Sequence, residues 1–253
     1  MAKAVKDDSI SVLEVSTGTV EFCVLGTSPL IMNRMAAKAK RELLLPKGRK
    51  TLADRAATLK HNPLAEYRDA AYRVPGDTAP TALCFFATGF KGALASAALD
   101  VPGAKKTEIG RLCRIEGVDL PIWGVPKLMM SVVRSADINR TPDVRTRPIL
   151  PEWACRVAIR FVKPKLNVQA VSNLLAWAGE TIGIGDFRQE KGKGSYGLFR
   201  LVPQDDPDFV GIVAEQGRAA QEAALAEPEP FDADTEELLD WYNNELKRTG
   251  RAA

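Results

Sequence analysis

Glycine and cationic side chains are concentrated in one loop, residues 183 to 197, which reads GIGDFRQEKGKGSYG. Its five glycines allow the backbone to approach a ligand closely and present amide groups, and its cations add positive charge beside them. This combination is typical of phosphate binding. The loop follows a helical pattern and precedes a strand pattern, which is the reverse of the dinucleotide-binding order. A plain hairpin that needs glycine for its turns would have the same composition. The candidate residues are Arg188, Lys191, Gly192, Lys193 and Gly194.

A second cationic segment, residues 134 to 147, is predicted to be an irregular loop between two strands. Its arginines are separated by serine, asparagine and threonine, which also donate hydrogen bonds to phosphate oxygens. Such a loop can hold a nucleic-acid backbone without reading the bases. Asp137 and Asp143 provide an alternative, because they can pair with the same arginines inside the loop. The candidate residues are Arg134, Arg140, Arg145 and Arg147.

Lys91 belongs to a third candidate site, at the start of a helical pattern that follows the apolar run ALCFFA. Thr88 is the expected N-cap of this helix, and the free amides and the helix dipole favour an anion at such an end. A capped core helix with one exposed lysine would give the same pattern.

The residues that most hydrolases and metalloenzymes need are scarce. His61 is the only histidine, and Cys23, Cys84, Cys113 and Cys155 lie far apart with no CxxC pair. These counts disfavour a serine–histidine–aspartate triad, a two-histidine nuclease and a zinc site. The cysteines are expected to be reduced core residues. We expect no metal, no cofactor and no catalytic residue.

The net charge of +3 hides an uneven distribution along the chain. From residue 204 to 253 thirteen acidic residues outnumber four basic ones, so this tail carries −9 and the rest of the chain +12. A basic body suggests a polyanion-binding surface, and an ordinary solvated basic face would give the same count. Leu238, Tyr242 and Leu246 form an apolar stripe in the last helical stretch. The tail is therefore expected to pack on its own body or on an adjacent protomer.

These side chains must be positioned by an α+β fold, with a modified RRM-like or ferredoxin-like core at residues 1–203 and an acidic helical tail at 204–253. The order of strand, helix, strands, strand, helix and strand is that of the split βαβ unit.

No apolar run approaches the ~18 residues of a membrane span, and the chain starts without a signal core, which predicts a cytoplasmic location. Strand patterns cover residues 19–25, 82–87, 112–118, 120–125, 128–134, 154–162 and 196–202. Helix patterns cover residues 88–101, 167–182, 208–226 and 235–248, and a basic, mostly helical insertion covers about 31–80.

Taken together, residues 19 to 203 resemble the RAMP superfamily. The matching features are a Gly-x-x-Pro-Leu pattern after the first strand (Gly26, Pro29, Leu30), the KGAL sequence that starts at Lys91, and the glycine loop before the last strand. The resemblance implies the backbone subunit of a CRISPR effector complex, in which residues 134–150 form the projecting thumb. The implied partners are single-stranded guide RNA, target nucleic acid, further copies of the chain and other effector subunits.

This sequence departs from the RAMP pattern at three places. Ala87 to Gly89 stand where the family has a Pro-Gly-Ser type of turn, and Ala95 stands where it has an arginine. No aspartate occurs between Thr27 and Ala53, where target-cleaving subunits carry one, so we expect no cleavage.

The expected function is sequence-independent binding of single-stranded RNA in an oligomeric array, without nuclease activity. Three aromatic residues near the glycine loop are candidates for base stacking, Phe199 being the one expected in the core: Phe187, Tyr196 and Phe199. One alternative is a single-stranded DNA-binding or annealing protein of a phage or mobile element, and another is a structural or scaffold protein. A third is a repeat-processing endoribonuclease with an acid or base chosen from His61, Tyr67, Tyr72 and Lys91.

Overall fold

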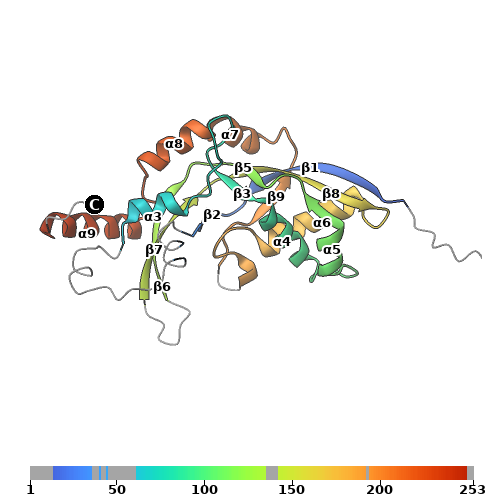
Figure 1. The fold of residues 1–253 in the computed structure, drawn as a ribbon, viewed down its shortest axis with the longest axis horizontal. Coiled ribbons are helices and arrows are strands. Elements are labelled where there is room, and N and C mark those ends of the chain that lie inside the picture. Colours follow the sequence, from blue (N-terminus) through green and yellow to red (C-terminus); the bar gives the residue numbers. More distant parts are fainter. Residues whose placement is uncertain are drawn as a thin grey trace, which may run out of the picture.

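The computed structural model describes residues 14–35, 40, 44, 61–134, 142–191 and 194–249, which fold as a mixed α+β protein (Figure 1). The larger sheet is antiparallel, with strand order β3-β5-β8-β1-β9 and with β4 also paired to β8. Its strands are β1 (Ser16–Gly26), β3 (Cys84–Phe86), β4 (Cys113–Ile115), β5 (Asp119–Trp123), β8 (Ala154–Lys163) and β9 (Phe199–Val202).

β1 and β8 form the centre of this sheet and pair from Ser16 opposite Lys163 to Leu25 opposite Ala154. Both strands have the polar–apolar alternation that predicts strands in the sequence, and successive side chains therefore face opposite sides of the sheet. Val24 points into the main core, whereas Cys23 and Leu25 belong to a smaller cluster on the other side.

Three helices cover the face of the sheet that carries the main core: α4 (Ala87–Ala97), α5 (Lys106–Leu112) and α6 (Val168–Trp177). α6 begins where the sequence predicts, because the Asn167 side chain accepts a hydrogen bond from the Ala170 amide at 2.8 Å. A π-helical turn (Ala178–Ile182) extends α6, and Gly183 ends it with a φ of 72°. α5 was not expected from the sequence.

The expected N-cap role of Thr88 is wrong. α4 starts one residue earlier, at Ala87, with Phe86 in the N-cap position and no side-chain capping bond. The reason is tertiary: β3 runs directly into the helix, and the Ala87 amide donates to the Val118 carbonyl oxygen at 2.8 Å. Thr88 therefore lies exposed in the first turn.

The opposite face of the sheet is partly covered by α7 (Pro207–Glu215), which Figure 1 shows on the other side from α4. Phe209 and Ile212 of α7 pack against Cys23 and Leu25 of β1. α8 (Arg218–Ala226) follows and inserts the fully buried side chain of Gln221 between β3 and β5.

A second, three-stranded antiparallel sheet has the order β2-β7-β6 and projects from the main sheet (Figure 1). Its strands are β2 (Leu30–Ile31), β6 (Lys127–Arg134) and β7 (Pro142–Leu150). The expectation of an irregular loop over 134–147 is therefore wrong for residues 142–147, which pair with β6 as part of a hairpin. We refer to β6 and β7 as the hairpin.

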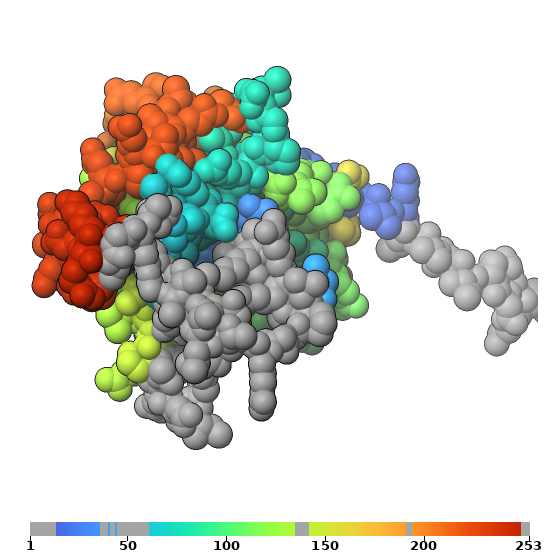
Figure 2. Space-filling model, turned by 60° about the vertical axis from the view of Figure 1, so that its left-hand side comes forward, coloured from blue at the N-terminus to red at the C-terminus, as the bar shows by residue number. Residues whose placement is uncertain are grey.

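The hairpin is flanked by α3 (Pro63–Ala70), the described helix of the basic insertion, and by α9 (Ala233–Thr249) of the tail. The Leu128 amide of β6 donates to the Glu229 carbonyl oxygen at 2.8 Å, and the Met130 amide donates to the Thr235 hydroxyl at 3.1 Å. Figure 2 shows α8 against α3 and α9 beside the hairpin. The tail thus packs on the body of its own chain. None of the helices in the described ranges has the length and apolar character that crossing a bilayer requires.

Candidate nucleic-acid interface

The glycine loop lies between the base of the hairpin and the main core. Backbone hydrogen bonds tie it to the first strands: the Asp186 amide donates to the Ile31 carbonyl oxygen at 3.0 Å, and the Gly197 amide to that of Pro29 at 2.8 Å. Gly197 has a φ of 70°, and a Cβ there would collide with the Ile184 carbonyl oxygen. The loop therefore needs this glycine for its own packing, which the alternative of a plain hairpin also predicts.

Arg147 joins the hairpin to the glycine loop. Its side chain is buried, its Nη1 donates to Asp186 Oδ2 at 2.9 Å, and its guanidinium lies 5.4 Å from the centre of the Phe187 ring. Burial lowers the pKa of Arg147, and the Asp186 carboxylate acts against this shift. Arg147 is therefore a residue that positions the hairpin, and it is not exposed to a nucleic acid.

Arg188 is also engaged within the loop. Its Nη2 lies 2.8 Å from Glu190 Oε2, and its Nη1 donates to the Gly185 carbonyl oxygen at 3.2 Å. Glu190 in turn accepts a hydrogen bond from Ser96 of α4 at 2.8 Å, which attaches the loop to that helix. The structure therefore brings the three segments singled out in the sequence side by side, while the charge of Arg188 is met inside the loop.

The remaining candidate residues of the glycine loop are Lys191, Gly192, Lys193 and Gly194. Lys191 ends a short 3-10 turn (Gln189–Lys191), and Gly194 packs against the Phe187 carbonyl group. Gly192 and Lys193 lie outside the described residues, as does Arg140 of the hairpin.

Lys91 has no hydrogen bond or ion pair with the glycine loop in the described part of the chain. Burial raises the pKa of the Cys113 thiol of β4 to about 11, and the positive charge of Lys91 acts in the opposite direction, which shows that Lys91 lies near this thiol. Ser96, which contacts the loop, is five residues further along α4 and points in a different direction from Lys91.

An aromatic cluster that the sequence did not reveal lies beside the glycine loop. Phe86, at the end of β3, is 38% exposed and packs edge-to-face on Tyr72, with ring centres 4.6 Å apart. The Tyr72 hydroxyl donates to the Asn33 carbonyl oxygen at 3.1 Å. Burial raises the pKa of Tyr72, the Asp186 charge raises it further, and the Arg34 charge lowers it. Arg34 and Asp186 therefore both lie near this hydroxyl group.

These groups form one continuous surface, which we call the aromatic–basic surface and define as Asn33, Arg34, Tyr72, Phe86 and Phe187. Asn33 connects its two ends, because its side-chain amide donates to Asp186 Oδ2 at 2.8 Å. Phe187 is 37% exposed and has a positive φ of 52°, a conformation held by the bond from its amide to Asp186 Oδ1. Phe199, in contrast, is buried in the core as expected.

Arginines without an ion pair among the described residues lie on this surface, at Arg34, and on the hairpin, at Arg134 and Arg145. Arg34, Arg134 and Arg145 are exposed, and within the described part of the chain none of them has an ion pair. On β6, Ser131 lies opposite Arg145, and its buried hydroxyl has no hydrogen-bond partner in the described ranges. The hairpin therefore presents the exposed side chains of Arg134 and Arg145 to solvent.

A groove of about 550 Å³ is lined by β6 of the hairpin, by the glycine loop and by the start of α9. Phe187 and Tyr196 of the glycine loop line it together with three acidic residues, Asp232, Asp234 and Glu237. The acidic residues repel phosphate, so this groove suits the uncharged edge of a base better than a nucleic-acid backbone.

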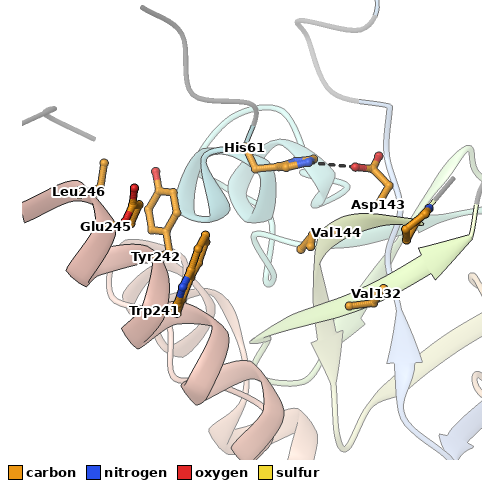
Figure 3. A pocket seen from close by; sticks show the side chains of 9 residues that line it. His61, Val132, Asp143, Val144, Trp241, Tyr242, Glu245 and Leu246 are labelled. Carbon is orange, nitrogen blue, oxygen red and sulfur yellow. Dashed lines mark hydrogen bonds and ion pairs between the residues drawn. The ribbon is translucent and has the colours of Figure 1, made fainter. Parts of the chain in front are cut away.

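His61 is engaged by two carboxylates. Its Nδ1 lies 2.9 Å from Glu66 of α3 and its Nε2 lies 3.0 Å from Asp143 of the hairpin, opposite Trp241 and Tyr242 of α9 (Figure 3). The hydroxyl of Tyr67 is buried and donates to the carbonyl oxygens of Pro126 and Ala224. These candidates for an acid or base thus hold elements of the fold together. Among the described residues, no group of three or more histidine, cysteine or acidic side chains is arranged to hold a metal ion.

Comparison with known proteins adds no relative: no protein-family model matches the chain, and no curated protein matches its sequence.

Proposed function

We propose that the chain binds single-stranded RNA without sequence preference, as a repeating backbone subunit of a guide-RNA complex of the CRISPR effector type. The observation that carries the proposal is the hairpin. The hairpin comes after β5 and before β8 in the chain, and it projects away from the main sheet (Figure 1). Its side chains Arg134 and Arg145 are exposed. This is the place and the charge that the RAMP resemblance implies for the thumb.

The main sheet supports an RRM-like, ferredoxin-like core. The elements β1, α4, β5, β8, α6 and β9 occur in this order along the chain, with other elements between them. Their strands lie in the antiparallel order β5-β8-β1-β9. α4 and α6 pack on the same core. This order and packing support the proposal of a split βαβ unit.

The nucleic acid is placed on the aromatic–basic surface and not on the open face of the sheet. RRM domains stack bases on aromatic residues of that open face. Here the exposed part of the face carries Thr17, Thr19 and Arg160 on the paired strands β1 and β8. The half-exposed rings of Phe86 and Phe187 lie instead near the glycine loop, where they offer stacking faces to any base.

The division of roles explains the absence of sequence preference in this proposal. Arg34, Arg134 and Arg145 neutralise phosphates, which are the same for every sequence. Phe86 and Phe187 stack on bases, and every base has a π-face. Arg147 and Asp186 contribute by fixing the distance between the hairpin and the loop.

Charge reversal on the hairpin tests the proposal. The double variant Arg134→Glu and Arg145→Glu is expected to weaken binding of a labelled single-stranded RNA about tenfold or more, because two phosphate contacts become repulsive. The slope of log K against log salt should fall by about 1.4. Fluorescence anisotropy with two unrelated sequences, as RNA and as DNA, gives both quantities.

The matched control is Arg111→Glu with Arg114→Glu, which makes the same charge change on exposed arginines of α5 and β4. Equal losses in both double variants would mean that only net charge matters and would contradict a site on the hairpin. Tighter binding of DNA than of RNA would favour the single-stranded DNA-binding alternative.

A second prediction concerns Phe86. Replacing Phe86 with alanine removes a stacking face and should weaken binding roughly fivefold to a hundredfold, whereas tyrosine at this position should retain it. The measurement is the same anisotropy titration, with circular dichroism as a check that both variants are folded. Wild-type affinity in Phe86→Ala would remove the aromatic–basic surface from the site.

A further inference from the structure

The outer edge of β1 is unpaired over much of its length. β8 pairs with β1 from Ser16 to Leu25, but β9 pairs with it only from Cys23 to Gly26 (Figure 1). Within the described ranges no strand lies beside residues 16–22 on the β9 side. This segment, STGTVEF, we call the free edge.

The direction of the backbone groups on the free edge follows from two hydrogen bonds. The Gly26 amide donates to Trp153 on the β8 side, and the Thr27 amide donates to Leu198 on the β9 side. Alternate residues of an antiparallel strand direct their N–H and C=O groups to opposite neighbours. Thr17, Thr19 and Glu21 therefore direct both groups away from β8, toward the unpaired side.

The free edge exists because the chain turns away after β9. Val202 lies opposite Cys23 and is the last residue of β9 that pairs with β1. The Asp206 amide then donates to the Pro203 carbonyl oxygen in a turn that leads into α7. β9 thus cannot continue along β1, and an open edge of this kind is a template for another strand.

We propose that the free edge pairs with the free edge of a second copy of this chain, in an antiparallel register with Thr19 opposite the partner's Thr19. The centre of residues 16–22 is residue 19, so this register uses the whole segment. Thr19 and the partner's Thr19 exchange two backbone hydrogen bonds, and Thr17 does the same with the partner's Glu21. The two main sheets become one continuous sheet around a two-fold axis.

Charge complementarity favours a second copy over an unrelated strand. Arg160 of β8 lies opposite Thr19, and its Nη2 donates to the Thr17 hydroxyl at 3.2 Å. In the proposed register the partner's Glu21 lies beside that same Thr17, on the same face. Within its own chain Glu21 is 57% exposed and lies 3.7 Å from Arg156, a long ion pair. The dimer thus brings each Glu21 beside the Arg160 of the other copy, so each carboxylate gains a second cation and each Arg160 gains a carboxylate.

Single-cysteine variants of the full chain, without nucleic acid, test this register directly. Under mild oxidation with diamide, Thr19→Cys should form a disulfide-linked dimer, because the two cysteines lie opposite each other across the axis. The control Thr17→Cys should not link to itself, and it should link when mixed with Glu21→Cys. The four native cysteines are buried, and burial raises the pKa of Cys84 and Cys113 to about 11, which keeps them out of the reaction.

Sedimentation velocity provides the non-covalent measurement. Glu21→Arg and Arg160→Glu should each shift the wild-type dimer toward monomer, and the double variant, which exchanges the charges, should restore the dimer. Efficient self-linking of Thr17→Cys, or equal linking of all variants, would overturn the register. A wild-type chain that sediments as a monomer at the highest attainable concentration would overturn the dimer, with no consequence for RNA binding.

Discussion

Replacing Gln221 with leucine is expected to lower the free energy of unfolding by about 4 kcal/mol, although the two side chains have similar size. Gln221 Oε1 accepts hydrogen bonds from the amides of Ala82 and Leu83 at 2.8 and 3.0 Å. Its Nε2 donates to the carbonyl oxygens of Ile122 and Gly124 at 2.7 and 3.0 Å. Leucine would leave these buried backbone groups, just before β3 and at the end of β5, without partners.

Urea unfolding followed by circular dichroism measures this effect, and Gln169→Leu is the matched control. Gln169 lies exposed on α6, where its side-chain amide donates to Asn173, and its replacement should change stability by less than about 0.5 kcal/mol. A loss below about 1 kcal/mol in Gln221→Leu would show that β3 and β5 do not depend on α8.

Gly197→Ala is expected to lower the free energy of unfolding by about 3 kcal/mol or more. Alanine disfavours the positive φ at this position, and its Cβ would collide with the Ile184 carbonyl oxygen. The damage should be local to the glycine loop. RNA affinity should therefore fall together with stability, since Asp186 in this loop holds Arg147 of the hairpin.

Gly92→Ala in α4 is expected instead to raise the free energy of unfolding. A Cβ at Gly92 meets no atom within 4 Å, and alanine in the interior of a helix is favoured over glycine by about 1 kcal/mol. The two glycine variants are compared by urea unfolding under the same conditions. Similar changes in both would contradict the close packing of the loop around Gly197.

The sequence predicted the elements whose signal is local. β1, β8 and α6 have clear periodicity, and Asn167 is a strong cap, so their positions could be read within a few residues. β7 could not, because its sequence PDVRTRPIL contains two prolines and three charges. It is a strand because β6, β2 and α3 pack around it, and these contacts involve residues distant in sequence.

The sequence singled out three separate segments as candidate sites and could not show how they lie relative to one another. In the structure the glycine loop contacts both the hairpin and α4. The sequence could not show that Asp186 and Glu190, within the loop itself, engage Arg147 and Arg188. Phe86 was missed because it ends an apolar run that predicts burial, and its exposure depends on where β3 stops.

The amino-acid composition of the tail also did not predict its role in the fold. Its net charge of −9 suggests a solvated or competing segment, yet several of its residues hold the fold together. The Arg218 side chain donates to the carbonyl oxygens of Gly76, Ala79 and Thr81. Phe209, Gln221, Leu225 and Thr235 are all buried against strands that precede them by many residues. Deletion of residues 204–253 would therefore unfold the body and cannot isolate an effect of the tail on nucleic-acid binding.

The place of Gln221 in the chain also has a consequence for folding during synthesis. Gln221 forms hydrogen bonds with backbone groups that precede it by 97 to 139 residues. β3 and β5 therefore leave the ribosome long before the side chain that completes the hydrogen bonds beside them. At roughly 5–20 residues per second, these strands wait on the order of ten seconds with exposed edges. A product that terminates before α8 should thus remain open to proteolysis, and only a chain translated beyond α8 can close its core.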